Sequence, residues 1–207
     1  MVSAFIYLEG GATGANSKYL DISCERAFHK LLDRMEFTGR KPRLVACGGR
    51  GDVFNRFKTA LRSRGSNYIA MWIDSEDPMT NTENAWDHLA SVTTVSAWER
   101  PDEVTDDQVL FMTTCMETWI VADRETLKAH YGDKLFENRL PALVGLEGKN
   151  RHVIQEALER ATESCPSPYK KGERSFTIFA KLEPAALNNL PSFVRVQRIL
   201  KKKLPRR

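Results

Sequence analysis

The chain has 207 residues, of which 42% are hydrophobic and 28% charged, which is typical of a folded globular protein and argues against wholesale disorder. Its apolar runs stop well short of the roughly 18 residues that a membrane span needs, and its N-terminus lacks the basic segment and cleavage motif of a signal peptide. Four widely spaced cysteines without Cys-x-x-Cys exclude a zinc finger, argue against a disulfide scaffold and favour a cytoplasmic location.

The charge is unevenly distributed along the chain. Residues 1–150 contain 18 Lys and Arg against 22 Asp and Glu, whereas residues 151–207 contain 13 against 5. The basic segment predicts attraction to the phosphate backbone of nucleic acid, DNA or RNA, and the alternative is a solvated surface with a frayed tail. Residues 201–207 contain one large apolar side chain, so we expect them to add nothing to the core.

The first third of the chain alternates between apolar runs and amphipathic segments. Strands are predicted over residues 3–8, 43–47 and 68–73, with a helix over about 19–37 and a second helix capped by Asp52. This order, with short links, implies right-handed crossovers and a parallel sheet covered by helices on both faces.

The remainder of the chain is predicted to be mostly helical. Residues 78–108 are polar and irregular, attached to the body through Trp86 and Trp98, and residues 133–150 are expected to form a loop. A fourth strand is predicted over 109–112, followed by a short helix from Cys115, a helix from Asp123 to Gly132, and helices over 151–164, 176–181 and 191–204. We therefore predict an α/β core over residues 1–115 and a mostly helical region over 116–207 that packs on it as one compact unit.

Acidic residues follow two of the predicted strands. Glu9 comes directly after the first strand, and Asp74, Glu76 and Asp77 come directly after the third. Ligands of open α/β sheets bind at the carboxyl ends of the strands, where these carboxylates would repel one another unless a cation neutralised them. Glu9, Asp74 and Glu76 are therefore predicted to hold Mg²⁺ or Mn²⁺ for phosphodiester cleavage, provided that the first and third strands are neighbours. The alternative is that Asp74 and Asp77 form a turn or a helix cap before Pro78.

This arrangement resembles the Toprim fold of topoisomerases, primases and overcoming-lysogenization-defect nucleases. In that fold a Glu follows the first strand and an Asp-x-Asp motif follows a later one. Glu9 and Asp74 match the pattern, and Glu76 replaces the usual second Asp. The resemblance covers roughly residues 1–115.

A resemblance along nearly the whole chain is carried by the blocks Tyr-Leu-Glu-Gly-Gly, Val-Ala-Cys-Gly-Gly-Arg, Ile-Asp-Ser-Glu-Asp-Pro, Trp-Asp-His-Leu, Cys-Met-Glu-Thr-Trp-Ile-Val-Ala-Asp and Lys-Lys-Gly-Glu-Arg-Ser-Phe. These blocks are similar to the bacterial domain-of-unknown-function family 4276. The resemblance implies a Toprim-like nuclease that acts beside a partner ATPase in phage defence.

Other polar residues are candidates for the same edge of the sheet. Glu117 lies in an apolar stretch after the fourth strand, so it is a candidate metal ligand or general base, or a Glu on an exposed helix edge. Arg50 follows the second strand and could hold a phosphate through its planar fork, or pair with Asp52 or Glu9. Lys170 and Lys171 form a basic loop that could approach the acidic residues.

Two other functions are compatible with the sequence. The segment Gly10-Gly11-Ala12-Thr13-Gly14 is a glycine-rich turn between a strand and a helix, where a Rossmann-like protein would bind a nucleotide. The second strand ends in Cys-Gly-Gly-Arg, however, without the acidic residue that would hold a ribose. A non-catalytic interaction subunit is the other alternative.

Overall fold

The strands form a single parallel sheet in the described part of the chain, which in this computed structural model comprises residues 4–11, 17–63, 65, 67–92 and 97–206. The strand order is β2-β1-β3-β4, so the connection from β2 to β3 crosses over β1. Leu8 of β1 lies beside Ala46 on one side and Trp72 on the other. The strands are β1 (Ala4–Leu8), β2 (Arg43–Ala46), β3 (Tyr68–Asp74) and β4 (Val109–Met112).

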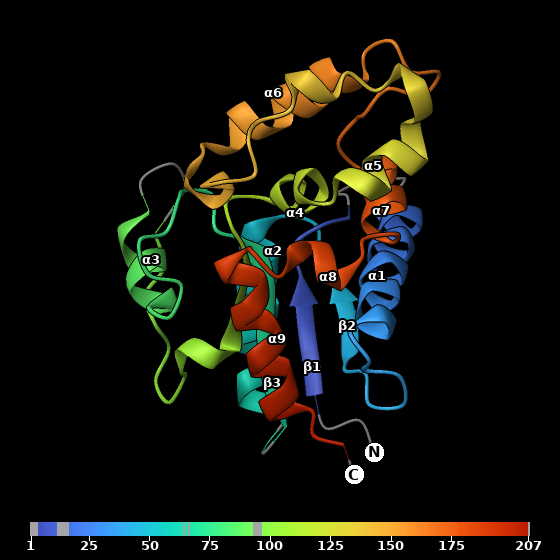
Figure 1. The fold of residues 1–207 in the computed structure, drawn as a ribbon. Coiled ribbons are helices and arrows are strands. Elements are labelled where there is room, and N and C mark those ends of the chain that lie inside the picture. Colours follow the sequence, from blue (N-terminus) through green and yellow to red (C-terminus); the bar gives the residue numbers. More distant parts are fainter. Residues whose placement is uncertain (1–3, 12–16, 64, 66, 93–96, 207) are drawn as a thin grey trace.

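Helices connect the strands and then complete the chain (Figure 1). The helices are α1 (Ser17–Arg34), α2 (Arg50–Ser63), α3 (Ala85–Ser91), α4 (Met116–Ala122), α5 (Arg124–Tyr131), α6 (Arg151–Thr162), α7 (Glu173–Phe179), α8 (Pro184–Leu187) and α9 (Pro191–Lys203). Short 3-10 turns lie between them, namely η1 (Asp106–Gln108), η2 (Gly132–Lys134), η3 (Glu137–Arg139) and η4 (Leu146–Gly148).

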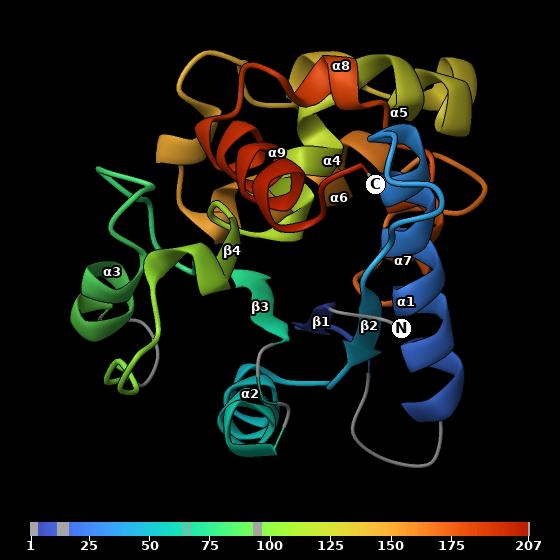
Figure 2. The same cartoon turned by 90° about the horizontal axis from the view of Figure 1, so that it is seen from below.

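Both faces of the sheet are covered, because alternate strand side chains point to opposite sides. Ile6 and Leu8 belong to a large buried cluster with α1 and with α4 to α9, whereas Phe5 and Tyr7 pack in a smaller cluster with α2 and α3. Seen from below, α2 lies on one side of the sheet and α1 and α9 on the other (Figure 2). The structure thus confirms the predicted α/β class, with a parallel sheet flanked by helices.

The larger cluster also joins the two predicted regions of the chain. Trp72 of β3 makes an edge-on contact with Trp119 of α4, and the ring of Trp119 meets Phe193 of α9. Side chains from both sides of residue 115 share this cluster. The division of the chain into a core over 1–115 and a helical region over 116–207 stays a prediction.

Several predicted boundaries were wrong. The second helix begins at Arg50, so Asp52 lies within its first turn and does not cap it. The segment predicted to be irregular contains α3, whose Trp86 and Leu89 are buried. The segment predicted to be a loop over 133–150 contains the 3-10 turns η3 and η4 and the end of η2. Polar side chains predominate around α3 and hide its periodicity, and turns of three residues are too short to show one.

The C-terminal segment is not a free tail. Leu204 is buried in the larger cluster, contrary to the expectation that residues 201–207 add nothing to the core. Lys202 and Lys203 both lie within ion-pair distance of Asp107, at 3.0 and 3.8 Å, and Arg206 pairs with Glu36 at 2.8 Å. Much of the positive charge at this end is therefore already paired with carboxylates.

Two further findings bear on the class of protein. Over the described residues, none of the helices has the length and apolar character needed to cross a bilayer. Cys24, Cys47, Cys115 and Cys165 are all buried and free of disulfide bonds, so they pack as small core residues.

Candidate functional site

The carboxyl ends of β1 and β3 meet at the centre of the sheet. The two strands are hydrogen-bonded neighbours, as the prediction required, and the chain leaves them in opposite directions because the strand order reverses there. Glu9 follows β1 directly, and its Oε2 accepts a hydrogen bond from the backbone N–H of Asp74 at 3.1 Å. Asp74 is the last residue of β3, and its Oδ1 accepts from the N–H of Met116 at 2.8 Å.

A cavity of about 160 Å³ opens at this point. Three carboxylates line it, from Glu9, Asp74 and Glu117, and Lys171 lies among them. The rest of the wall is formed by Gly10, Gly11, Gly48, Met116, Gly172, Ser175 and Phe176. The structure thus brings together Glu9, Asp74, Glu117 and Lys171, which the sequence singled out from four separate segments.

The negative charge of the cavity is only partly compensated by neighbouring cationic side chains. Burial, together with the charges of Glu9 and Glu117, raises the pKa of Asp74 well above its ordinary value. Burial also raises the pKa of Glu9, although Arg50 opposes the shift. Partial burial disfavours the charge of Lys171, but Glu117 and Asp74 outweigh that effect and raise the pKa of its ammonium group. Added positive charge would therefore stabilise this cavity.

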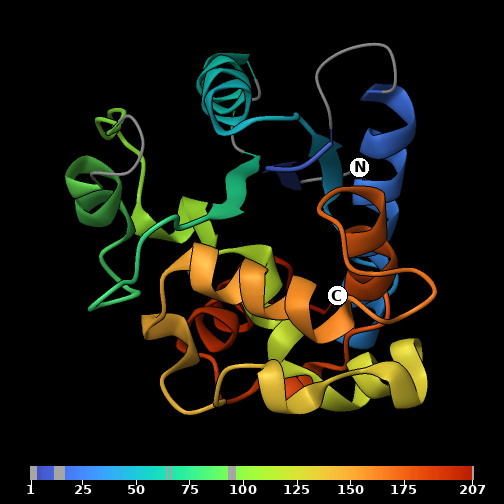
Figure 3. The same ribbon diagram turned by 90° about the horizontal axis from the view of Figure 1, so that it is seen from above.

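Glu117 is held at both of its oxygens. It lies in the first turn of α4 and is completely buried. Its Oε1 accepts a hydrogen bond from the hydroxyl of Tyr169 at 2.5 Å, and its Oε2 accepts from Nε2 of Gln155 on α6 at 3.3 Å. Figure 3 shows α6 lying across this end of the molecule, in front of α4. The partners Tyr169 and Gln155 were missed by the sequence analysis, because nothing local marks either residue.

Glu76 lies apart from the other predicted metal ligands. It has a left-handed backbone conformation, with φ at 71°, and its carboxylate forms an ion pair with Arg151 at the start of α6. It does not line the cavity. The extended backbone that would have turned Asp74 and Glu76 to the same side ends at Asp74.

The three predicted phosphate-binding residues, Arg50, Lys170 and Lys171, differ in their relation to the cavity. Both lysines are exposed, but only Lys171 lines the cavity and Lys170 does not. Arg50 donates from Nη1 to the backbone carbonyl of Asp74 at 3.3 Å, and its guanidinium lies 4.2 Å from the ring centre of Trp98. Its Nε and Nη2 are buried without an acceptor among the described residues. Arg50 thus reaches the site with two guanidinium nitrogens that have no acceptor. Among the described residues it forms no ion pair with Asp52 or Glu9.

Glycine is required where the backbone closes the cavity. Gly10 and Gly48 exchange backbone hydrogen bonds at 2.8 and 2.9 Å, which joins the loops after β1 and β2. Gly11 has φ at +101°, and a Cβ there would lie 2.1 Å from Oδ1 of Asp21. Ala12, Thr13 and Gly14 of the proposed nucleotide loop lie outside the described residues.

The donor set fits a divalent cation held by two carboxylates. The described residues contain no group of three or more His, Cys, Asp or Glu side chains arranged to hold a metal ion. Glu9 and Asp74 each use one oxygen to accept a backbone N–H, and no described residue donates to the other. Mg²⁺ commonly takes one or two protein carboxylates and completes its shell with water and substrate phosphate, so this pair suffices.

Comparisons with known proteins place few constraints on the chain. No protein-family model matches it, and no curated protein matches it. Among solved structures, the C-terminal region of the Burkholderia pseudomallei OLD protein is similar, with a TM-score of 0.44 and 13% sequence identity over 99% of both chains. The resemblance to family 4276 therefore stays a prediction, and the function has to be argued from the cavity itself.

Proposed function

We propose that the chain is a divalent-metal-dependent enzyme that cleaves phosphodiester bonds in nucleic acid, with the cavity as its active site. The observation that carries the proposal is the meeting of Glu9 and Asp74 at the centre of the sheet, both with a raised pKa and both with one oxygen that receives no protein donor. A buried carboxylate beside a half-buried one is costly unless a cation relieves their repulsion.

The roles of the residues follow from their positions. Glu9 and Asp74 would hold Mg²⁺ or Mn²⁺, which supplies polarisation of a phosphoryl oxygen and lowers the pKa of a bound water. Lys171, in the cavity wall, and Arg50, with its unused donors, would bind the oxygens of the phosphate. Glu117 is fixed by Tyr169 and Gln155, and we assign it to accept the proton that the attacking water loses.

The remaining sequence predictions become part of the proposal in modified form. Glu76 would support the site from outside by pairing with Arg151, rather than holding the metal. The exposed Lys170 would add positive charge beside Lys171. A partner ATPase and a role in phage defence are implied by the family resemblance, and the unpaired cysteines fit a cytoplasmic location.

Cleavage of plasmid DNA and of RNA in Mg²⁺ or Mn²⁺ tests this function. Asp74→Asn preserves shape and removes one charge, so it should abolish cleavage. Asp133→Asn is the matched control, because Asp133 is exposed and forms no ion pair in the described part of the chain. Equal cleavage by wild type and Asp74→Asn would contradict the proposal.

Metal binding provides a readout that needs no partner protein. Calorimetric titration with Mn²⁺ should show binding by wild type and Asp133→Asn and much weaker binding by Asp74→Asn. Absence of Mn²⁺ binding by wild type would contradict the proposed function whether or not an ATPase partner is needed for cleavage.

A further inference from the structure

A second hollow lies on the other side of the sheet, between α2 and β2. This groove has a volume of about 420 Å³, with Tyr7, Val45 and Ala60 as its apolar floor and Arg43 and Arg56 among its walls. It exists because α2 packs against β1 and β3, which leaves the adjacent face of β2 without a helix over it among the described elements (Figure 2).

The two arginines of the groove are free to bind an anion. Neither forms an ion pair within the described part of the chain, although Asp52 precedes Arg56 by one helical turn. No Asp or Glu lines the groove. A planar guanidinium with no carboxylate partner is suited to bidentate binding of a phosphate.

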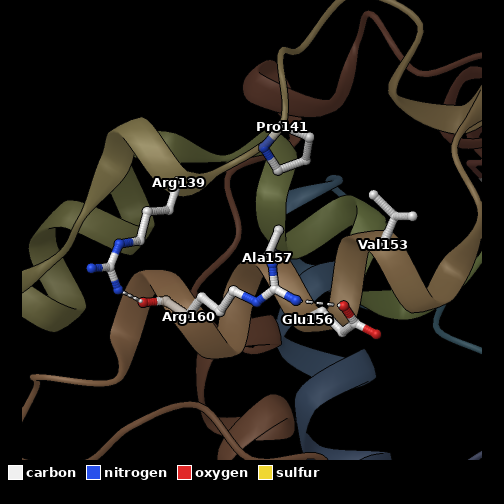
Figure 4. A pocket seen from close by; sticks show the side chains of 6 residues that line it. All are labelled: Arg139, Pro141, Val153, Glu156, Ala157 and Arg160. Atoms are coloured by element: carbon white, nitrogen blue, oxygen red, sulfur yellow. Dashed lines mark hydrogen bonds and ion pairs between the residues drawn. The ribbon is translucent and has the colours of Figure 1, made fainter.

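A larger cavity, of about 600 Å³, also contains two arginines, but these are paired with carboxylates. Among its lining residues, Arg160 pairs with Glu156 at 2.9 Å (Figure 4). Arg139, which also lines this cavity, pairs with Glu163. The arginines of that cavity are neutralised by neighbours on the chain, whereas those of the groove are not.

The groove and the active-site cavity are formed in part by neighbouring stretches of the chain. Val45 in the groove precedes Gly48 of the cavity wall by three residues, and β2 ends at Ala46 between them. Arg50 and Arg56 are six residues apart on α2, or about 9 Å. The helix that carries Arg56 of the groove therefore also carries Arg50, which contacts the backbone carbonyl of Asp74.

We propose that the groove binds the phosphodiester backbone of a nucleic acid strand, with Arg43 and Arg56 on its phosphates and the apolar floor against its sugars or bases. Continuation of this strand from the groove into the cavity rests on the proposed function, whereas binding in the groove does not. Because phosphate contacts carry no base information, binding should be independent of sequence.

Binding of fluorescently labelled single-stranded DNA and RNA oligonucleotides in EDTA tests the groove without metal or cleavage. The test protein is the double variant Arg43→Gln/Arg56→Gln. The matched control is Arg26→Gln/Lys30→Gln, which removes two exposed charges from α1, on the other face of the sheet. Anisotropy is followed between about 50 and about 200 mM salt.

The groove variant should bind more weakly than wild type for every sequence tested. Its plot of log affinity against log salt should be shallower by about 1.4, because two contacts to single-stranded phosphate contribute about 0.7 each. The control should behave like wild type. No binding by wild type, or equal binding by groove variant and wild type, or equal loss in both variants, would overturn the proposal.

Two further readouts separate failure of the groove from failure of the active site. The groove variant should retain wild-type affinity for Mn²⁺ and wild-type cleavage of bis(p-nitrophenyl) phosphate, which is too small to span both sites. Wild type could fail to bind Mn²⁺ and fail to cleave that ester, yet still bind oligonucleotides through Arg43 and Arg56. That result would contradict the proposed function and support nucleic acid binding in the groove.

Discussion

Removal of the Tyr169 hydroxyl tests whether the Glu117 carboxylate is held in place by its hydrogen bonds. Tyr169 is buried, and its hydroxyl donates to Oε1 of Glu117 at 2.5 Å. Burial and the neighbouring Glu117 raise the pKa of Tyr169, so the phenol is a proton donor at neutral pH. Tyr169→Phe leaves a buried carboxylate oxygen without this donor.

The expected cost follows from the kind of bond that is lost. A hydrogen bond to a charged group contributes about 1.5–3 kcal/mol, so the free energy of unfolding should fall by about 2 kcal/mol. For a chain of this size each kcal/mol lowers the Tm by about 2–4 °C, which gives a decrease of about 4–8 °C. Urea unfolding followed by tryptophan fluorescence measures the free energy directly.

Tyr131→Phe is the matched control for this experiment. Tyr131 is also buried, but its hydroxyl has no hydrogen-bond partner among the described residues. Its removal should leave the free energy of unfolding unchanged or raise it slightly. If Tyr169→Phe is as stable as wild type, or if both variants lose the same stability, the reasoning about Glu117 is refuted.

Three other substitutions test separate parts of the structure. Asp74→Asn should raise the free energy of unfolding at neutral pH without metal. The raised pKa of Asp74 means that the folded state keeps a proton that the unfolded state has released, so the wild type loses stability as pH rises between those two values. Urea unfolding at neutral and at low pH checks this. A difference in the free energy of unfolding between variant and wild type that does not shrink at low pH would contradict it. Leu204→Ala should cost about 2–5 kcal/mol because Leu204 is buried. Leu143→Ala is the control, because this side chain is 51% exposed, and it should change the free energy of unfolding by less than about 0.5 kcal/mol. If the two variants lose similar stability, Leu204 lies outside the core. Gly11→Ala should lower the Tm, since its Cβ would meet Asp21, whereas a Tm as high as that of wild type would contradict the turn geometry.

The fold and half of the site could be predicted from local patterns. Each strand is a short apolar run, and the order of strands and helices fixes a parallel sheet, so the class required no long-range information. Glu9 and Asp74 could be placed at one edge because they directly follow their strands. That β1 and β3 are neighbours could only be assumed, since strand order is set by packing across the whole sheet.

The parts that could not be predicted depend on contacts between distant segments. Glu76 is two residues from Asp74, but a left-handed backbone and Arg151, far along the chain, turn it away. Tyr169 and Gln155 approach Glu117 from α6 and the loop after it, and no periodicity encodes that approach. Likewise, the ion pairs of Lys202 and Lys203 could not be predicted, because their partner Asp107 is about a hundred residues away in the sequence.

The central claim is that Glu9 and Asp74 hold a divalent cation in the cavity. The most direct measurement is the anomalous difference density of crystals soaked in Mn²⁺, collected beside crystals of Asp74→Asn treated in the same way. We predict a peak between the two carboxylates of the wild type, within about 2.0–2.2 Å of an oxygen from each, and none in the variant. An empty cavity in the wild type, or a peak that persists in Asp74→Asn, would contradict the account.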